Sequence, residues 1–99
     1  MKIKLSEALA IISAPRDVAI ERALADDATI EDVARAGLLI RKVTTFWLRH
    51  ADPANHQAIL HAEDEHLKAM SLRLMEIDVG SDLTAATIAA DVLRPRAKP

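Results

Sequence analysis

The sequence predicts an all-α protein, a four- or five-helix bundle built on one long antiparallel helical hairpin. Of its 99 residues, 51% are hydrophobic and 28% are charged, which is typical of an ordinary globular domain. Only 2% are aromatic, tyrosine is absent and glycine occurs twice, so little material is available for strands and their turns. Two long amphipathic stretches flank Asp52-Pro53, a pair that ends one helix and starts the next. We expect residues 1–99 to form a single helical domain.

Two short helices are expected before the hairpin. Ser6 can cap the first of them, which carries apolar residues at helical spacing as far as Ile12. Pro15 is expected to end this helix and to occupy the first turn of a second one. The second helix carries Val18 and Leu24 and is expected to end near residues 25–28.

The hairpin is predicted from residues 30–50 and 53–78. Thr29 and Asp32 have the spacing of a capping box, and Asp52 can cap the second helix with Pro53 in its first turn. Because only two or three residues connect the helices, they must run antiparallel. The stripe expected on the first helix consists of Val33, Ala36, Ile40, Val43 and Trp47. The face expected on the second consists of Ile59, Leu60, Leu67, Met70, Leu74 and Ile77.

The chain is expected to close with one more helix. Gly80 can end the hairpin and Ser81 can cap a last helix over residues 82–93. Residues 93–99 are basic and interrupted by proline, so we expect a frayed tail.

The charge and the composition limit which classes of binding partner and which cellular compartment the sequence predicts. A net charge of -2 gives no general attraction to nucleic acid or to an anionic membrane. Zero cysteines exclude disulfides and thiol chemistry and fit a reducing compartment. Ser6 and Glu7 interrupt the first apolar run, unlike a secretory signal, and no stretch approaches the ~20 apolar residues of a membrane span. We expect a cytoplasmic protein that binds no membrane and no nucleic acid.

The stretch HQAILHAEDEH, residues 56–66, holds three of the four histidines and three carboxylates. On a helical wheel, Glu63 falls near the centre of the apolar face, with His56 in line and His66 at the edge. A carboxylate there is costly unless it is paired, hydrogen-bonded or bound to a cation. One hypothesis is that Glu63 pairs with Arg16 or Arg22, or lies at an oligomer interface.

The other hypothesis is a transition-metal site formed by Glu63, His66 and His56. Glu63 and His66 have the i, i+3 spacing by which ferritin-like bundles present ligands. With the preceding "DP" and "AIL", about thirty residues resemble parts of encapsulated ferritin-like proteins, and the resemblance implies a metal site completed by a second subunit. Those proteins need a glutamate inside the preceding helix, where this chain has Ile40, Val43 and Trp47.

The stretch ATIEDVARAGLLIRKVTTFWLRH resembles the helix-turn-helix of LacI-type repressors. The resemblance implies a first helix over residues 30–35 and a DNA-recognition helix over residues 41–49. Gly37 falls one residue earlier than in that pattern, and Leu39 replaces the expected cap. One continuous helix explains the apolar period more simply, with Arg41, Lys42 and Arg49 on a solvated face.

The sequence therefore predicts a small non-enzymatic helical protein that acts through protein–protein interaction. It would serve as a homo-oligomer, adaptor, inhibitor or assembly component. No nucleophile or phosphate-binding loop accompanies Glu63, so no catalytic residue and no cofactor is assigned. Leu72 and Met75 form a second apolar strip and, with Trp47, are the predicted interface residues. A metal-binding bundle using Glu63 and His66, and a helix-turn-helix DNA-binding regulator, remain the alternatives.

Overall fold

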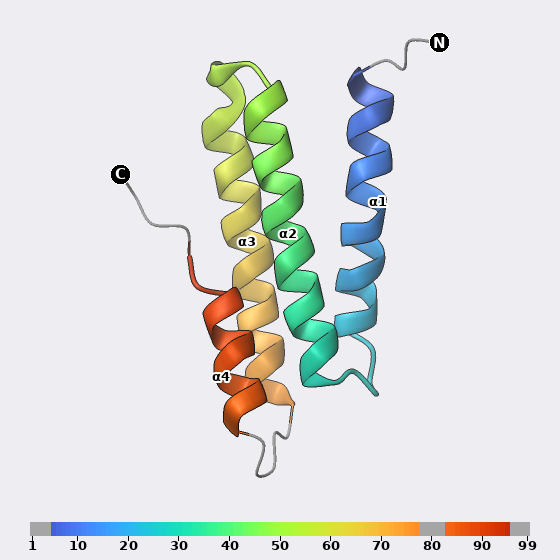
Figure 1. Ribbon diagram of the computed structural model, residues 1–99, viewed down its shortest axis with the longest axis vertical. Coiled ribbons are helices and arrows are strands. Elements are labelled where there is room, and N and C mark those ends of the chain that lie inside the picture. Colours follow the sequence, from blue (N-terminus) through green and yellow to red (C-terminus); the bar gives the residue numbers. More distant parts are fainter. Residues whose placement is uncertain (1–4, 78–82, 96–99) are drawn as a thin grey trace.

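The computed structural model describes residues 5–77 and 83–95, and all regular structure in these ranges is helical. The helices follow one another as α1 (Leu5–Ala23), α2 (Ile30–His50), α3 (His56–Glu76) and α4 (Leu83–Val92), with a 3-10 turn, η1 (Pro53–Asn55), between α2 and α3. α1 and α4 lie on opposite sides of the hairpin formed by α2 and α3 (Figure 1). The predicted all-α bundle built on a long hairpin is confirmed. The predicted stop at Gly80 and cap at Ser81 lie outside the described residues.

The two ends of the hairpin form as their local sequence predicts. At the start of α2, the Thr29 backbone N–H donates to the Asp32 carboxylate at 2.9 Å, and the Asp32 N–H donates to the Thr29 hydroxyl at 3.3 Å. At the start of η1, the Asp52 carboxylate accepts from the Ala54 N–H at 2.9 Å. α3 begins at His56 rather than at residue 53 because its first turn is wound as a 3-10 helix.

The core lies where the other helices meet α2. Val33, Ala36 and Ile40 of α2 are at most 1% exposed, and Met70 of α3 is fully buried against them. α1 packs mainly on α2 and touches α3 much less, while α4 packs on the other flank of α2. The remaining members of this core are Ala19, Ala23, Leu67 and Leu93.

Pro15 does not end a helix as predicted, because α1 runs without a break from Leu5 to Ala23. A proline inside a helix removes one backbone hydrogen bond and crowds the preceding turn. Here its ring is exposed, and Ala19 and Ala23 beyond it are buried in the core. Packing of the second half of α1 on the hairpin offsets the lost bond.

Gly37 lies in the middle of α2 and is buried under the C-terminal end of α4. A Cβ added there would lie 2.7 Å from Leu93 Cδ2 and 2.8 Å from Val92 Cγ1. The glycine therefore allows close approach of α4 and marks no turn. Residues 36–40 are helical, so the turn required by a helix-turn-helix motif is not formed there.

Two arginines of the hairpin donate hydrogen bonds to backbone carbonyl groups at the ends of the outer helices. Arg41 of α2 donates to the Val92 carbonyl at 2.6 Å and also to the Arg94 carbonyl. Arg73 of α3 donates to the Ala23 carbonyl at 2.9 Å and to the Ala25 carbonyl at 2.7 Å. Carbonyls at a helix end lack partners within their own helix. Arg41 is thus an anchor for α4, which corrects its expected place on a solvated face; Lys42 and Arg49 are exposed as expected.

Gly37→Ala tests the contact between α2 and α4. In an open helix this change gains about 1 kcal/mol of stability from helix propensity. Leu93 is only 3% exposed and has little room to move. We therefore expect overpacking to outweigh that gain and to lower the free energy of unfolding by about 1 kcal/mol. Urea denaturation followed by circular dichroism measures the sign. A more stable variant would mean that α4 does not pack on Gly37.

Candidate functional site

Two hollows adjoin α1, and both are open to solvent. The inner cleft, of about 320 Å3, lies between α1, α2 and α3 near the hairpin turn. The outer groove, of about 590 Å3, lies between α1 and α2. The inner cleft contains the residues that the sequence singled out, whereas the outer groove was not predicted.

Glu63 forms part of the wall of the inner cleft and is only 3% exposed. This burial agrees with its predicted place on the apolar face of the helix. Trp47 and Ile59 contribute apolar wall, while Arg16 of α1 and His66 of α3 bring polar groups to the same cleft. The cleft thus combines apolar walls with a carboxylate, a guanidinium and an imidazole.

Of the two arginines predicted as partners for Glu63, only Arg16 lines this cleft. Its guanidinium also forms an ion pair with Asp17 at 3.0 Å. Arg22 instead pairs with Asp27 at 2.9 Å and with Asp32 at 3.4 Å, where it ties α1 to the start of α2.

The structure places Glu63 and His66 on the wall of one cleft but leaves His56 outside its lining. Within residues 5–77 and 83–95, no group of three or more His, Asp or Glu side chains is placed to hold a metal ion. The predicted metal site therefore remains a hypothesis that needs a further donor, as from a second subunit.

His66 is partly buried, and its environment disfavours the charged imidazolium. Burial lowers the pKa of His66 below its ordinary value, the nearby Arg16 lowers it further, and Asp17 opposes both effects. At neutral pH the imidazole is therefore uncharged and able to accept a hydrogen bond.

This lowered pKa gives a pH dependence of stability. Between the pKa in the folded protein and the unfolded value of about 6.5, the unfolded chain binds a proton at residue 66 that the folded protein does not. The contribution of His66 to stability is therefore fully present above about pH 6.5, and it is lost as the pH decreases below this value. We expect His66→Gln to remove part of this fall, measured by urea denaturation at about pH 7.5 and about pH 5.5. If the variant loses as much stability between these two pH values as the wild type, His66 has the same pKa in the folded and the unfolded chain.

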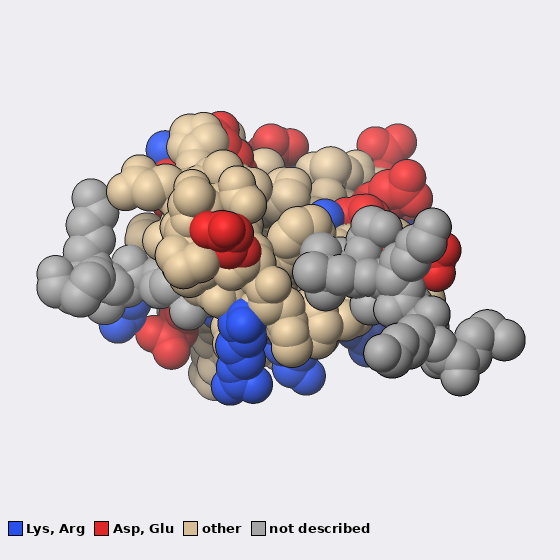
Figure 2. Space-filling view, turned by 90° about the horizontal axis from the view of Figure 1, so that it is seen from above, with Lys and Arg blue, Asp and Glu red and all other residues tan. Residues whose placement is uncertain are grey.

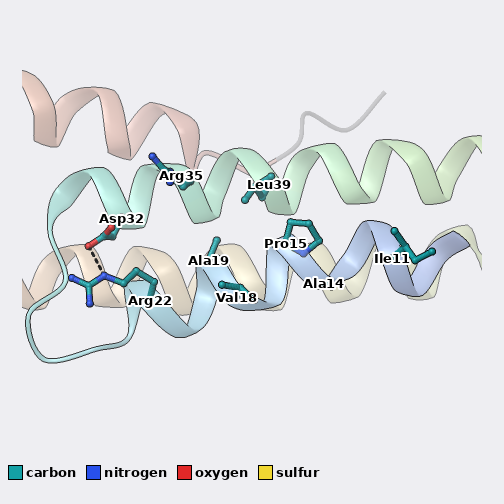
Figure 3. A pocket seen from close by; sticks show the side chains of 9 residues that line it. All are labelled: Ile11, Ala14, Pro15, Val18, Ala19, Arg22, Asp32, Arg35 and Leu39. Carbon is teal, nitrogen blue, oxygen red and sulfur yellow. Dashed lines mark ion pairs between the residues drawn. The ribbon is translucent and has the colours of Figure 1, made fainter. Parts of the chain in front are cut away.

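The outer groove has an apolar floor and a charged end. Ile11, Pro15 and Val18 of α1 face Leu39 of α2 across it (Figure 3). Ile11 and Val18 are 63% and 65% exposed, which is high for such large apolar side chains. The ion pair between Arg22 and Asp32 closes one end, and Arg35 lies beside it on α2.

The outer face of α2 carries positive charge that no acidic side chain of the described chain neutralises. Arg35, Lys42 and Arg49 are exposed at seven-residue intervals, and within residues 5–77 and 83–95 none of them forms an ion pair. Viewed along the helices, Lys and Arg lie mainly along the lower edge of the molecule, and Asp and Glu mainly along the upper edge and right side (Figure 2). Most other described basic side chains pair with acids: Arg16, Arg22, Lys68, Arg73 and Arg94.

The predicted interface residues separate into two places. Leu72 and Met75 lie on the outer face of α3, 62% and 81% exposed. Trp47 is half-buried in the wall of the inner cleft. The outer groove escaped prediction because Pro15 was expected to separate Ile11 and Val18 into two helices. A continuous seven-residue spacing between these two residues was the available signal.

No family model, curated protein or solved structure matches the chain. Among the helices that the structure describes, none is long and apolar enough to cross a membrane.

Proposed function

We propose that this is a non-enzymatic helical protein that acts through protein–protein interaction and associates with itself through the outer groove. The observation that carries the proposal is the apolar floor of the groove, where Ile11 and Val18 are exposed beside Leu39. Contiguous exposed apolar surface in a small protein commonly marks an interface. The cysteine-free sequence supports a cytoplasmic setting for this role.

The distribution of apolar side chains supports an interface rather than a self-sufficient core. The largest fully buried side chains are Ile40, Met70 and Val33, all of moderate size. Nine large hydrophobic residues of the described chain remain exposed: Ile11, Val18, Leu24, Leu38, Leu60, Leu72, Met75, Leu83 and Ile88. A protein of this size buries a limited fraction of its surface alone, so covering even part of this area would add stability.

The groove is favoured over the predicted Leu72–Met75 strip for two reasons. The groove lies between two adjacent helices, so that another pair of helices can pack against both of them. The strip lies on the convex outer face of α3, where the neighbouring Lys68 is already paired with Asp64 at 3.1 Å and with Glu65 at 3.8 Å. Beside the groove, Arg35 and Lys42 form no ion pair with any acidic residue that the structure describes.

Val18→Asp and Met75→Asp separate the two surfaces. Both residues are largely exposed, so neither change should unfold the chain. We expect the wild type to form dimers at high concentration, Val18→Asp to weaken dimerisation at least about tenfold, and Met75→Asp to leave it nearly unchanged. Analytical ultracentrifugation measures the association, and circular dichroism checks the fold.

Two results would contradict this proposal. A wild type that stays strictly monomeric at high concentration removes self-association. Loss of dimers in Met75→Asp but not in Val18→Asp would transfer the interface to the predicted strip on α3.

A further inference from the structure

Two rows of side chains border the outer groove, one on each helix. The row on α1 consists of Glu7, Ala14 and Glu21, and is acidic at its two ends. The row on α2 consists of Arg35, Lys42 and Arg49, and is basic throughout. Residues seven apart lie along one side of an α-helix, two turns from each other. Ala14 and Arg35 both line the groove, so each row runs along one of its borders.

The charges in the two rows have matching spacing. Glu7 and Glu21 are fourteen residues apart in the chain, as are Arg35 and Arg49, which is about 21 Å along a helix. α1 and α2 run antiparallel, and the ion pair between Arg22 and Asp32 sets them level at one end. Glu21 therefore lies near the level of Arg35, and Glu7 near the level of Arg49.

We propose that a second copy of this chain docks groove to groove, related by a two-fold axis parallel to the helices. This inference rests on the proposed function and gives it a geometry. α1 of each copy then covers α2 of the other, and the four helices form a bundle around the apolar floors. Glu21 faces the partner's Arg35 and Glu7 faces the partner's Arg49, so each ion pair occurs twice.

The charges favour this axis over the alternative, a two-fold axis that runs across the helices. A two-fold axis across the helices would place α1 on the partner's α1 and α2 on the partner's α2. The Arg-Lys-Arg row would then oppose itself, and so would the two glutamates. Like charges brought together at an interface are strongly unfavourable, whereas the parallel axis brings opposite charges together at both ends of the rows and places Lys42 opposite the uncharged Ala14.

In the part of the chain that the structure describes, neither row has an ionic partner that would compete with the second copy. Glu7 and Glu21 are exposed and, like the three basic residues, form no ion pair within residues 5–77 and 83–95. Two adjacent helices of 19 and 21 residues present a face about 30 Å long and about 20 Å wide. With its side-chain relief, this face is of the order of the ~800 Å2 per partner found in specific complexes.

A charge exchange tests this arrangement. Arg35→Glu with Arg49→Glu makes both borders acidic, and Glu7→Lys with Glu21→Lys makes both borders basic. We expect each double variant alone to dimerise at least about tenfold more weakly than the wild type. Mixed in equal amounts, they should form a heterodimer, because every Glu then faces a Lys or Arg. Analytical ultracentrifugation measures association, and mass spectrometry under native conditions identifies the mixed species.

A matched control separates the interface from the effect of net charge. Glu21→Lys and Glu65→Lys change the net charge equally, but Glu65 lies exposed on α3, away from the groove. Only Glu21→Lys should weaken the dimer, and the dimer of the wild type should weaken with added salt.

The outcomes distinguish the arrangement from the broader proposal. If Val18→Asp dissociates the dimer while both double variants dimerise like the wild type, the groove is the interface but this axis is wrong. Double variants that weaken the dimer and form no heterodimer when mixed also overturn the axis. A wild type that never dimerises removes the arrangement and the proposed self-association together.

Discussion

The structure depends on the apolar stripe of α2, against which the other helices are placed. Val33, Ala36 and Ile40 are buried against core residues of α1 and α3 and against Leu93, which follows α4. A helix that packs neighbours over more than half of its circumference keeps only one open side. On α2 that side carries Arg35 and Lys42. The same packing that forms the core therefore leaves the charged face and the adjoining groove open.

The outer helices need more than apolar contact to stay in place. α4 is ten residues long, and an isolated helix of that length is marginal in water. Close approach at Gly37 brings its end within reach of Arg41, which satisfies two terminal carbonyls. Arg73 does the same for the end of α1. In both cases a hairpin arginine bonds the carbonyl groups that a helix end cannot satisfy by itself.

The features predicted correctly are those decided by neighbours in the sequence. The capping box at Thr29 and the turn at Asp52 involve contacts over two or three residues, so their spacing alone specifies them. Pro15 and Arg41 were misjudged because their roles depend on partners far along the chain. Local rules read Pro15 as an interruption and Arg41 as solvated, and only the position of the outer helices explains their roles. The continuous helix through Gly37 was predicted correctly, but its close contact with the end of α4 was not. The buried place of Glu63 was predictable from periodicity, and Arg16, one of its two predicted partners, lines the same cleft. Which of the two arginines lies there depends on the packing of α1 on α2, which the spacing in the sequence does not specify.

The two hollows share one wall, because Arg16 in the inner cleft and Pro15 in the outer groove belong to the same helix. α1 holds chiefly to α2, touches α3 much less, and contributes Arg16 to the cleft beside Glu63. A second copy docked on the outer groove would add contacts to α1 and thereby favour its position on the hairpin, with Arg16 beside this buried carboxylate. Binding that favours the folded state raises stability by mass action. In the proposed dimer, the stability of the fold would therefore increase with protein concentration.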